Sequence, residues 1–269
     1  MRLRISHTTS YAYDGPVPYA LQQVRLRPKE TAAQKVLDWR LTVTGGKTEC
    51  RFEDSHRNAV DLVSFDPGTT RLTLHAEGEV EVEDTSGVIG AHGGFAPLWL
   101  FERITPLTRP GPGVRRLVQS VAGPGVLDRL HALMAAIPVA VAYEPGRSAV
   151  GWTAEDALTA GHGVCQDMAH VFIAAARLMG VPARYVSGYL MMTDRVEQDA
   201  THAWAEAHVP GLGWVGFDIA NGMCPDAGYV RVATGLDYAE AAPVSGMRVG
   251  AGTEHLTVAL AVAQVQVQQ

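Results

Sequence analysis

The sequence has few cysteines and no recognisable metal motif, and both absences exclude classes of protein. Its three cysteines, Cys50, Cys165 and Cys224, cannot all be paired within the chain, so we expect free thiols and not a disulfide framework. No Cys-x-x-Cys, His-Glu-x-x-His or EF-hand calcium pattern is present. We therefore expect neither a bound metal nor a cofactor.

The chain also lacks an excess of positive charge and a long hydrophobic run. With a formal net charge of −6, it has no broad attraction for phosphate backbones or anionic lipids, and we expect neither nucleic acid nor a membrane as a partner. Its longest uncharged apolar run, residues 133–143, is far below the roughly 20 residues that span a bilayer. The first residues show no secretory signal, which predicts a cytoplasmic protein.

What the first 82 residues do contain is a series of short runs in which apolar and polar residues alternate between turn signals. This spacing is typical of strands and predicts a β-sandwich. Because residues 87–94 are rich in glycine, we place a linker at 89–112, between an N-terminal β-rich domain (1–88) and a core (113–269). The expected strands cover residues 3–13, 23–27, 36–43, 48–52, 60–65, 71–76 and 79–82.

Beyond residue 112 apolar residues recur at intervals of three and four, as they do in amphipathic helices. Helices are expected over 114–122 and over 126–137, where Pro138 supplies the stop. Thr153 is an N-cap signal for a short helix that ends at Ala160. A further helix is expected over 165–179, and strands over 183–191, 202–209, 213–220 and 256–267. The fold class is therefore α+β.

Cys165 is the candidate nucleophile because it begins a predicted helix, directly after Gly161-His-Gly-Val164. The unpaired amides and the macrodipole at a helix start stabilise an anion, which favours a thiolate. The same amides could form an oxyanion hole. A buried structural cysteine is the alternative, so the interpretation requires a base nearby. Asp167, in the same turn, is interpreted as a residue that stabilises the helix dipole.

His202 and Asp218 are the candidate base and its orienting carboxylate. Alternation puts both on the polar faces of neighbouring strands, with small or apolar residues on the opposite faces. A three-residue hairpin loop closed by His208 and Leu212 would set His202 directly opposite Asp218. Directly opposed side chains are close enough for a carboxylate to fix the tautomer of an imidazole.

Other histidines and two tryptophans are weaker candidates. His162 lies in the glycine loop before the cysteine and is the rival base, but it has no obvious orienting carboxylate. His208 lies roughly 20 Å along the strand from His202 and is interpreted as a rim residue. Trp204 and Trp214 are predicted to pack around the hairpin.

Four segments carry a joint pattern: Gly163-Val-Cys-Gln-Asp-Met-Ala-His170, Gly180-Val-Pro-Ala-Arg-Tyr-Val-Ser-Gly-Tyr189, Thr201-His-Ala-Trp-Ala-Glu206 and Gly213-Trp-Val-Gly-Phe-Asp218. Together they resemble the bacterial transglutaminase-like family. His7-Thr-Thr-Ser-Tyr-Ala-Tyr13 and Leu26-Arg-Pro28 resemble the β-rich domain that precedes the core in that family. The resemblance implies a papain-like core in which the nucleophile-bearing helix packs on an antiparallel sheet. It puts the nucleophile on Cys165, the histidine on His202 and the aspartate on Asp218.

The resemblance also implies a reaction, namely cysteine-dependent acyl transfer from amide or peptide bonds through a thioester, with a peptide or protein as substrate. We expect hydrolysis, as in a protease or amidase, while amine-accepting cross-linking and non-catalytic binding are the alternatives. Two segments depart from the family pattern: Ile219-Ala-Asn-Gly222 replaces Pro-Thr-Asn-Gly, and Gly235-Leu-Asp-Tyr238 replaces Gly-Arg-Asp-Tyr. These departures change the expected cleft rim and leave the three site residues in place.

Overall fold

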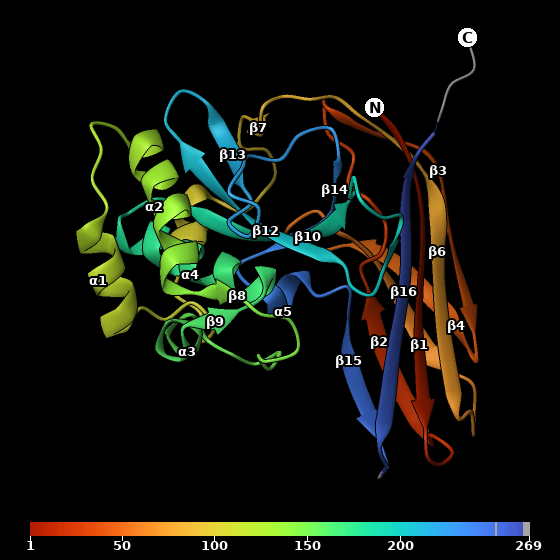
Figure 1. The fold of residues 1–269 in the computed structure, drawn as a ribbon. Helices are drawn as coiled ribbons and strands as arrows, with labels where there is room; N and C mark the ends of the chain where they lie inside the picture. The colour runs from red at the N-terminus through yellow and green to blue at the C-terminus, as the bar shows by residue number, and fades with distance from the viewer. Residues whose placement is uncertain (251, 266–269) are drawn as a thin grey trace.

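In the computed structural model the chain forms a β-sandwich packed against a core of helices and strands (Figure 1). The structure describes residues 1–250 and 252–265. One sandwich sheet has the order β11-β16-β1-β6-β3 and the other β15-β2-β5-β4, with antiparallel neighbours throughout. Their strands are β1 Arg2–Tyr13, β2 Tyr19–Val24, β3 Gln34–Thr44, β4 Gly46–Glu53, β5 Ala59–Phe65, β6 Arg71–Val82, β11 Glu197–Gln198, β15 Val244–Val249 and β16 Glu254–Gln264.

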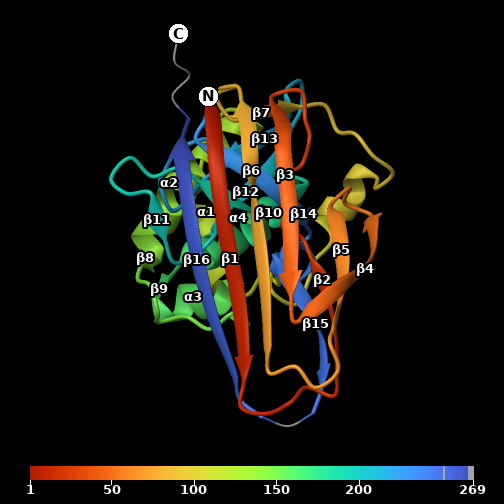
Figure 2. The same ribbon diagram turned by 90° about the vertical axis from the view of Figure 1, so that its right-hand side faces the viewer.

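One face of the long strands β1 and β6 is buried against two different partners. Tyr11 and Leu72 pack in the cluster between the two sandwich sheets. Leu3, Ile5 and Val80, further along the same face, pack against residues of the core. Because side chains alternate along a strand, this one face contributes to two hydrophobic clusters. Figure 2 shows these strands extending along the molecule in front of the core.

The core contains a five-stranded antiparallel sheet of order β14-β10-β12-β13-β7. Helix α4 packs its apolar side on Ala203, Ala205 and Ala207 of β12, and the sandwich lies on the other side of the sheet (Figure 1). The elements are β7 Val88–Gly90, η1 Leu98–Glu102, α1 Pro112–Ser120, α2 Val126–Ala140, β8 Ala142–Tyr143, α3 Ala154–Ala160, β9 His162–Gly163, α4 Cys165–Leu178, β10 Ala183–Leu190, β12 His202–Val209, β13 Gly213–Phe217, β14 Tyr229–Gly235 and α5 Tyr238–Ala241.

The structure confirms the α+β class and most expected elements, with several local differences. Strand β2 ends at Val24, before the end of the expected run 23–27, and β14 and β15 were not among the expected strands. The runs 71–76 and 79–82 form one strand, β6. At Gly78 a β-carbon would lie 2.1 Å from the backbone oxygen of Asp38, so this glycine permits a close approach of β3 and does not break the strand. Helix α2 continues past Pro138 to Ala140, because the proline removes only its own N–H donor and the next turn still closes.

The sheet membership of several segments differs from the predicted division of the chain. Strands β15 and β16, which we assigned to the core, pair with β2 and β1 of the sandwich. At the expected boundary between residues 88 and 89, β7 pairs with β13. In the expected linker, Phe101 of η1 packs on Trp214 with ring centroids 5.0 Å apart. Alternation identifies a strand but not its partner, which explains these differences. The end of the expected strand 256–267 lies outside the described residues.

The free edge of β14 is covered by side chains and backbone of the sandwich. Lys29 donates its backbone N–H to the carbonyl of Arg231 at 3.0 Å, and the Gln34 amide bonds both backbone groups of Arg231 at 2.8 Å. The Asn58 amide does the same for Thr234, also at 2.8 Å. These bonds pair backbone N–H and C=O groups of β14 that could otherwise pair with a strand of another protein molecule. They also fix the sandwich against the core.

Glu206 carries a buried charge on the sandwich-facing side of the core sheet. It is 0 % exposed and accepts hydrogen bonds from Arg231 Nε and Arg184 Nε, both at 2.6 Å, and from Arg231 Nη2 at 3.0 Å. Burial raises the pKa of this carboxyl, but the Arg231 and Arg184 guanidiniums outweigh burial and lower the pKa to about 2. The carboxylate therefore neutralises part of a buried positive charge.

Replacing Glu206 with glutamine should reduce the free energy of unfolding by about 3–5 kcal/mol, because two guanidiniums would stay in the interface without their counter-charge. Urea unfolding followed by tryptophan fluorescence would measure the loss. Glu79→Gln is the matched control, since Glu79 also bonds two arginines, Arg2 and Arg4, but in contact with solvent, where little change is expected. Equal losses at the two sites would contradict the role assigned to Glu206.

The lowered pKa of Glu206 predicts that the free energy of unfolding depends on pH. Its folded pKa of about 2 lies below the ordinary value of about 4.3 for glutamate. The stabilisation is therefore present above about pH 4.3 and is lost as the pH falls toward 2. The Glu206→Gln variant should show a correspondingly shallower loss of stability in acid.

Candidate active site

The start of α4 determines where Cys165 lies. Cys165 is the first residue of this helix and is partly buried. Asp167 accepts a hydrogen bond from the Val164 backbone N–H at 2.8 Å, which agrees with its interpretation as a residue that stabilises the helix start. A β-carbon on Gly163 would lie 2.8 Å from the side chain of Asp167, so the glycine makes room for this contact. Cys165 therefore lies in the first turn of α4, where backbone amides have no partner within the helix.

The structure brings His202 and Asp218 together. His202, at the start of β12, is 8 % exposed, and Asp218, just after β13, is fully buried. Asp218 Oδ2 lies 2.7 Å from His202 Nε2. This bond leaves Nδ1 as the ring nitrogen free to act on Cys165, and it fixes the orientation of the imidazole.

Asp218 is itself held by two residues that the spacing argument missed. Its Oδ2 accepts hydrogen bonds from the Tyr229 hydroxyl at 2.7 Å and from the Asn221 side-chain amide at 2.6 Å. Burial raises the pKa of the carboxyl, but His202, Tyr229 and Asn221 together hold the pKa below its ordinary value. Asn221 is the asparagine retained in the segment 219–222, so the family pattern could have pointed to it. Tyr229 comes from β14, which no sequence spacing connects to Asp218.

The surroundings of His202 favour a protonated imidazole. Burial lowers its pKa, but the hydrogen bond to Asp218 and the interaction with the Cys165 sulfur outweigh burial and raise the pKa to about 10. At neutral pH the arrangement therefore places an imidazolium between a sulfur and a carboxylate. Such a group can donate a proton to a leaving amine.

The hairpin brings His202 to Asp218 in a register that differs from the predicted one. Val209 pairs with Gly213, and His208 pairs with Trp214 instead of closing the loop with Leu212. Pro210 and Gly211 explain the difference. The Leu212 N–H bonds the Val209 carbonyl at 3.1 Å and Gly211 has φ +86°, as in a type II turn with proline at its second position and glycine at its third.

The pairing is displaced by two residues relative to the prediction, and a shift of two keeps every side chain on its face. His202 and Asp218 are therefore diagonal neighbours on the same side of the sheet. Their contact was predicted, although the direct opposition from which it was derived was wrong.

The remaining candidates of the sequence lie elsewhere. The His162 ring packs on Trp152 with centroids 5.4 Å apart, and its Nδ1 lies 3.1 Å from the Ala160 carbonyl. His208 packs on Trp214 at the far end of β12. Trp204 and Trp214 are both buried in hydrophobic clusters, as predicted for packing residues, and Trp214 also lines a cavity between the sandwich and the core.

Two tyrosines near Cys165 were not identified from the sequence. Tyr143 lies in β8, whose parallel pairing sets it beside Gly163 of β9, and burial followed by the charges of Cys165 and Asp218 raises the pKa of its hydroxyl. Tyr185 of β10 is buried, and burial followed by Cys165 raises its pKa well above the ordinary value. Both hydroxyls stay protonated close to the sulfur. Nothing in their local spacing separates them from ordinary strand residues.

The described residues contain neither a metal-binding cluster nor a membrane-spanning helix. Within residues 1–250 and 252–265, no group of three or more His, Cys, Asp or Glu side chains is arranged to hold a metal ion. Among the helices of the described part of the chain, none has the length and apolar character needed to cross a membrane.

Both halves of the chain match family models. Residues 114–219 match the model of the transglutaminase-like superfamily, and residues 3–81 match that of the bacterial transglutaminase-like N-terminal region. The chain has a transglutaminase-like core and a bacterial transglutaminase-like N-terminal region. Cys165, His202 and Asp218 all lie within the segment matched as the transglutaminase-like core.

Other proteins are similar to this chain over most of their length. An uncharacterized protein of Mycobacterium leprae is 27% identical, with 98% of this chain and 99% of that protein covered. An uncharacterized protein of Mycobacterium bovis is 28% identical, with coverages of 91% and 87%. A crystal structure from Cytophaga hutchinsonii, named a "putative cysteine protease", superposes with a TM-score of 0.79 at 22% identity and covers 100% of this chain and 92% of that one. That likeness shows the shared fold.

Proposed function

We propose that this transglutaminase-like protein is a cysteine-dependent acyl-transfer enzyme that cleaves amide or peptide bonds through a thioester. The observation that carries the proposal is the buried His202–Asp218 hydrogen bond of 2.7 Å next to a cysteine at a helix start. A structural cysteine needs no such pair. In this proposal Cys165 is the nucleophile, His202 the acid and base, and Asp218 the group that orients His202.

The reaction would proceed in two halves. The Cys165 thiolate attacks the carbonyl carbon, and the developing oxyanion accepts hydrogen bonds from the first-turn amides of α4. The C–N bond then breaks, the amine leaves with a proton from His202, and a thioester remains on the sulfur. His202 next takes a proton from water, the resulting hydroxide attacks the thioester, and a free acid and the thiolate are released.

We favour water as the acceptor, so that the enzyme is a hydrolase of the protease or amidase type. The support is the likeness to a protein named a "putative cysteine protease", and the inference is by analogy. If a primary amine attacked the same thioester, the product would be a new amide bond. The two outcomes share every step up to the thioester.

A trapping experiment tests the proposal. Wild-type protein is incubated with a mixture of peptides and a tagged primary amine, quenched in acid within seconds and digested. We expect an acyl adduct on the peptide that contains Cys165, and peptide products that have gained water. Cys224→Ala should give the same adduct, since Cys224 is also partly buried but lies outside any helix and has no helix-start amides beside it. An adduct on Cys224 alone, or no adduct and no product, would refute the proposal.

A further inference from the structure

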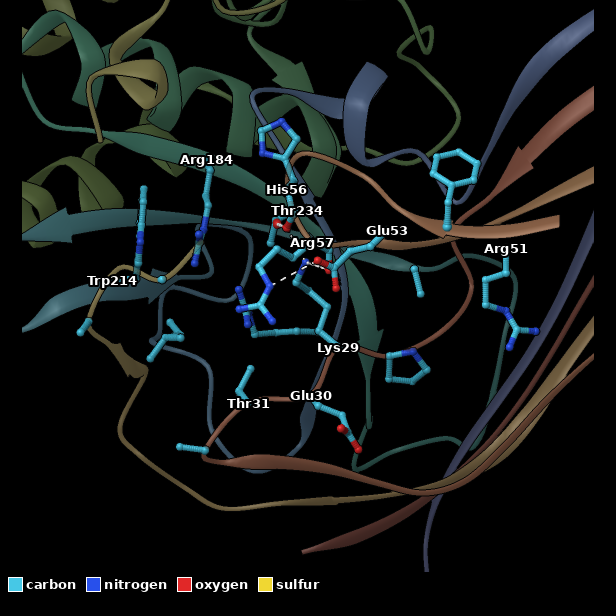
Figure 3. Close-up of a pocket in the computed structure, with 18 residues that line it drawn as sticks. Lys29, Glu30, Thr31, Arg51, Glu53, His56, Arg57, Arg184, Trp214 and Thr234 are labelled. Carbon is cyan, nitrogen blue, oxygen red and sulfur yellow. Dashed lines mark hydrogen bonds and ion pairs between the residues drawn. The ribbon is translucent and has the colours of Figure 1, made fainter. Parts of the chain in front are cut away.

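A cavity lies between the sandwich and the core, and Cys165 is not among the residues that line it. It has a volume of about 770 Å³ and is lined from one side by two sandwich segments, residues 28–32 and 51–59, and from the other by core strands. Figure 3 shows Arg184 and Trp214 next to each other on one wall, with Lys29 and Arg57 on the sandwich loops. Arg184 pairs across the sheet with Glu206, which is four residues from His202 along β12, or roughly 13 Å.

The two core arginines have donors that face this cavity. Arg184 uses only Nε to bond Glu206, and Arg231 uses Nε and Nη2. Both Nη groups of Arg184 and the Nη1 group of Arg231 have no protein partner among the described residues, yet none of them is among the buried unpaired atoms. They therefore open into the cavity, which is lined by both residues.

Arg184 is also held in a fixed orientation. Its guanidinium carbon lies 3.9 Å from the centroid of the Trp214 ring, and its Nε is tied to Glu206. The ring stacking and the ion pair leave the outer edge of the guanidinium as a preorganised fork of N–H donors. Such a fork matches the spacing of two oxygens of a carboxylate or phosphate.

Positive charge in the cavity exceeds negative charge. Four arginines line the cavity, against two glutamates: Arg51, Arg57, Arg184 and Arg231, and Glu30 and Glu53. Glu206 is the one counter-charge bonded to both Arg184 and Arg231. Lys29 also lines the cavity, with its amino group bonded to the neutral oxygens of His56, Arg57 and Asn58. Burial, followed by repulsion from Arg231 and Arg184, lowers the pKa of Lys29 to about 7. This concentration of positive charge contrasts with the net charge of −6 of the whole chain, so the pocket attracts anions although the protein as a whole does not.

We propose that this pocket binds a small ligand through an oxyanion group, carboxylate or phosphate, on Arg184 and Arg231. The ligand would contact residues of both the sandwich and the core, and its binding would hold the two together. The site is separate from the proposed acyl-transfer site and does not depend on it.

Isothermal titration calorimetry at constant ionic strength tests the proposal with inorganic phosphate and with malonate as probes. We expect one of them to bind with a dissociation constant of about 1 mM or tighter, and Arg184→Lys to weaken that binding at least about tenfold. Lysine keeps the charge beside Glu206 but loses the fork. Arg40→Lys is the matched control, since Arg40 pairs with Glu77 on the exposed sandwich surface. The Arg40→Lys protein should bind the probe with the affinity of the wild type.

A measurement on the wild-type protein covers the case in which Arg184→Lys fails to fold. Phenylglyoxal modifies accessible guanidiniums, and peptide masses report each site. The bound probe should slow modification of Arg184 and leave Arg40 unaffected. Phosphate binding alone would identify a phosphate site and malonate binding alone a carboxylate site. Binding of neither probe, unchanged affinity in a folded Arg184→Lys protein, or modification of Arg184 at the same rate with and without the probe would overturn the proposal.

Discussion

Replacing Cys165 with serine should lower the rate of amide-bond cleavage by roughly 10⁴-fold or more. Serine keeps the size of the side chain at the start of α4, but its hydroxyl is a far weaker acid than a thiol. An imidazolium at position 202 cannot stabilise an alkoxide as it stabilises a thiolate. The enzyme would therefore lose the nucleophile while its fold stays intact. Initial rates on a peptide substrate found by the trapping experiment give the measurement.

Cys224→Ser controls for the loss of a partly buried thiol. Cys224 packs against the same hydrophobic cluster as Cys165, and burial raises the pKa of its thiol, so it should be unreactive. We expect this variant to keep its rate within about twofold and both variants to keep their thermal midpoints within a few degrees. Cleavage by Cys165→Ser within tenfold of the wild-type rate would exclude thioester chemistry.

Replacing Asp218 with asparagine should lower turnover by roughly 10⁴-fold, the size seen when the orienting carboxylate of a comparable triad is lost. The amide keeps the shape of the side chain and its contacts with Tyr229 and Asn221 largely in place. It removes the charge that stabilises the imidazolium of His202, however, and it can select the wrong tautomer. Asn221→Ala is a useful companion, because it removes one support of Asp218 and should give a much smaller loss.

The Asp218→Asn substitution should also shift the pH dependence of kcat/KM. His202 must be protonated to release the amine, and its pKa of about 10 predicts that wild-type activity falls as the pH rises through about 10. Without the Asp218 carboxylate the pKa of His202 falls, so the alkaline limb of the Asp218→Asn profile should lie at lower pH. Identical alkaline limbs in the two proteins would show that His202 and Asp218 do not form a functional pair.

The pH dependence of the free energy of unfolding gives an independent measurement of the His202–Asp218 pair. The His202 pKa is raised above its unfolded value of about 6.5, so its stabilisation is complete below about pH 6.5 and is lost as the pH rises through about 10. The Asp218 pKa is lowered, so its stabilisation is present above about pH 3.9 and is lost in acid. The stability difference between wild type and Asp218→Asn should therefore be largest between about pH 4 and 6.5.

Local sequence patterns predicted most elements because each depends on its own residues. Thr153 caps α3 as expected and bonds the Asp156 backbone N–H at 3.2 Å. Cys165 begins α4 next to Asp167, which accepts the Val164 backbone N–H within the same turn. The contact of His202 with Asp218 was predictable because both belong to one hairpin, and an error of two residues in register leaves the faces unchanged.

Contacts between distant parts of the chain could not be predicted in this way. Tyr229 bonds Asp218 only because β14 pairs with β10. Arg231 of β14 can reach Glu206 of β12 because only one strand, β10, lies between them in the sheet. Alternation along a strand does not determine the order of strands in a sheet. The cavity between the sandwich and the core depends on that order, and so does the sheet membership of β15 and β16. Both are therefore visible only in the structure.

The pairing of β1 with β16 has a consequence for the order of folding. Leu3 pairs with Gln264, and all the core elements lie between these two strands in the sequence. Bringing the two strands together closes a very long loop, and non-local strand pairing of this kind is slow and leaves edges exposed to aggregation. Until it forms, one edge of β1 is open, and Leu3 and Ile5 lack Leu260 and Val262 of the same hydrophobic cluster. We therefore expect the β1–β16 pairing to form late in folding.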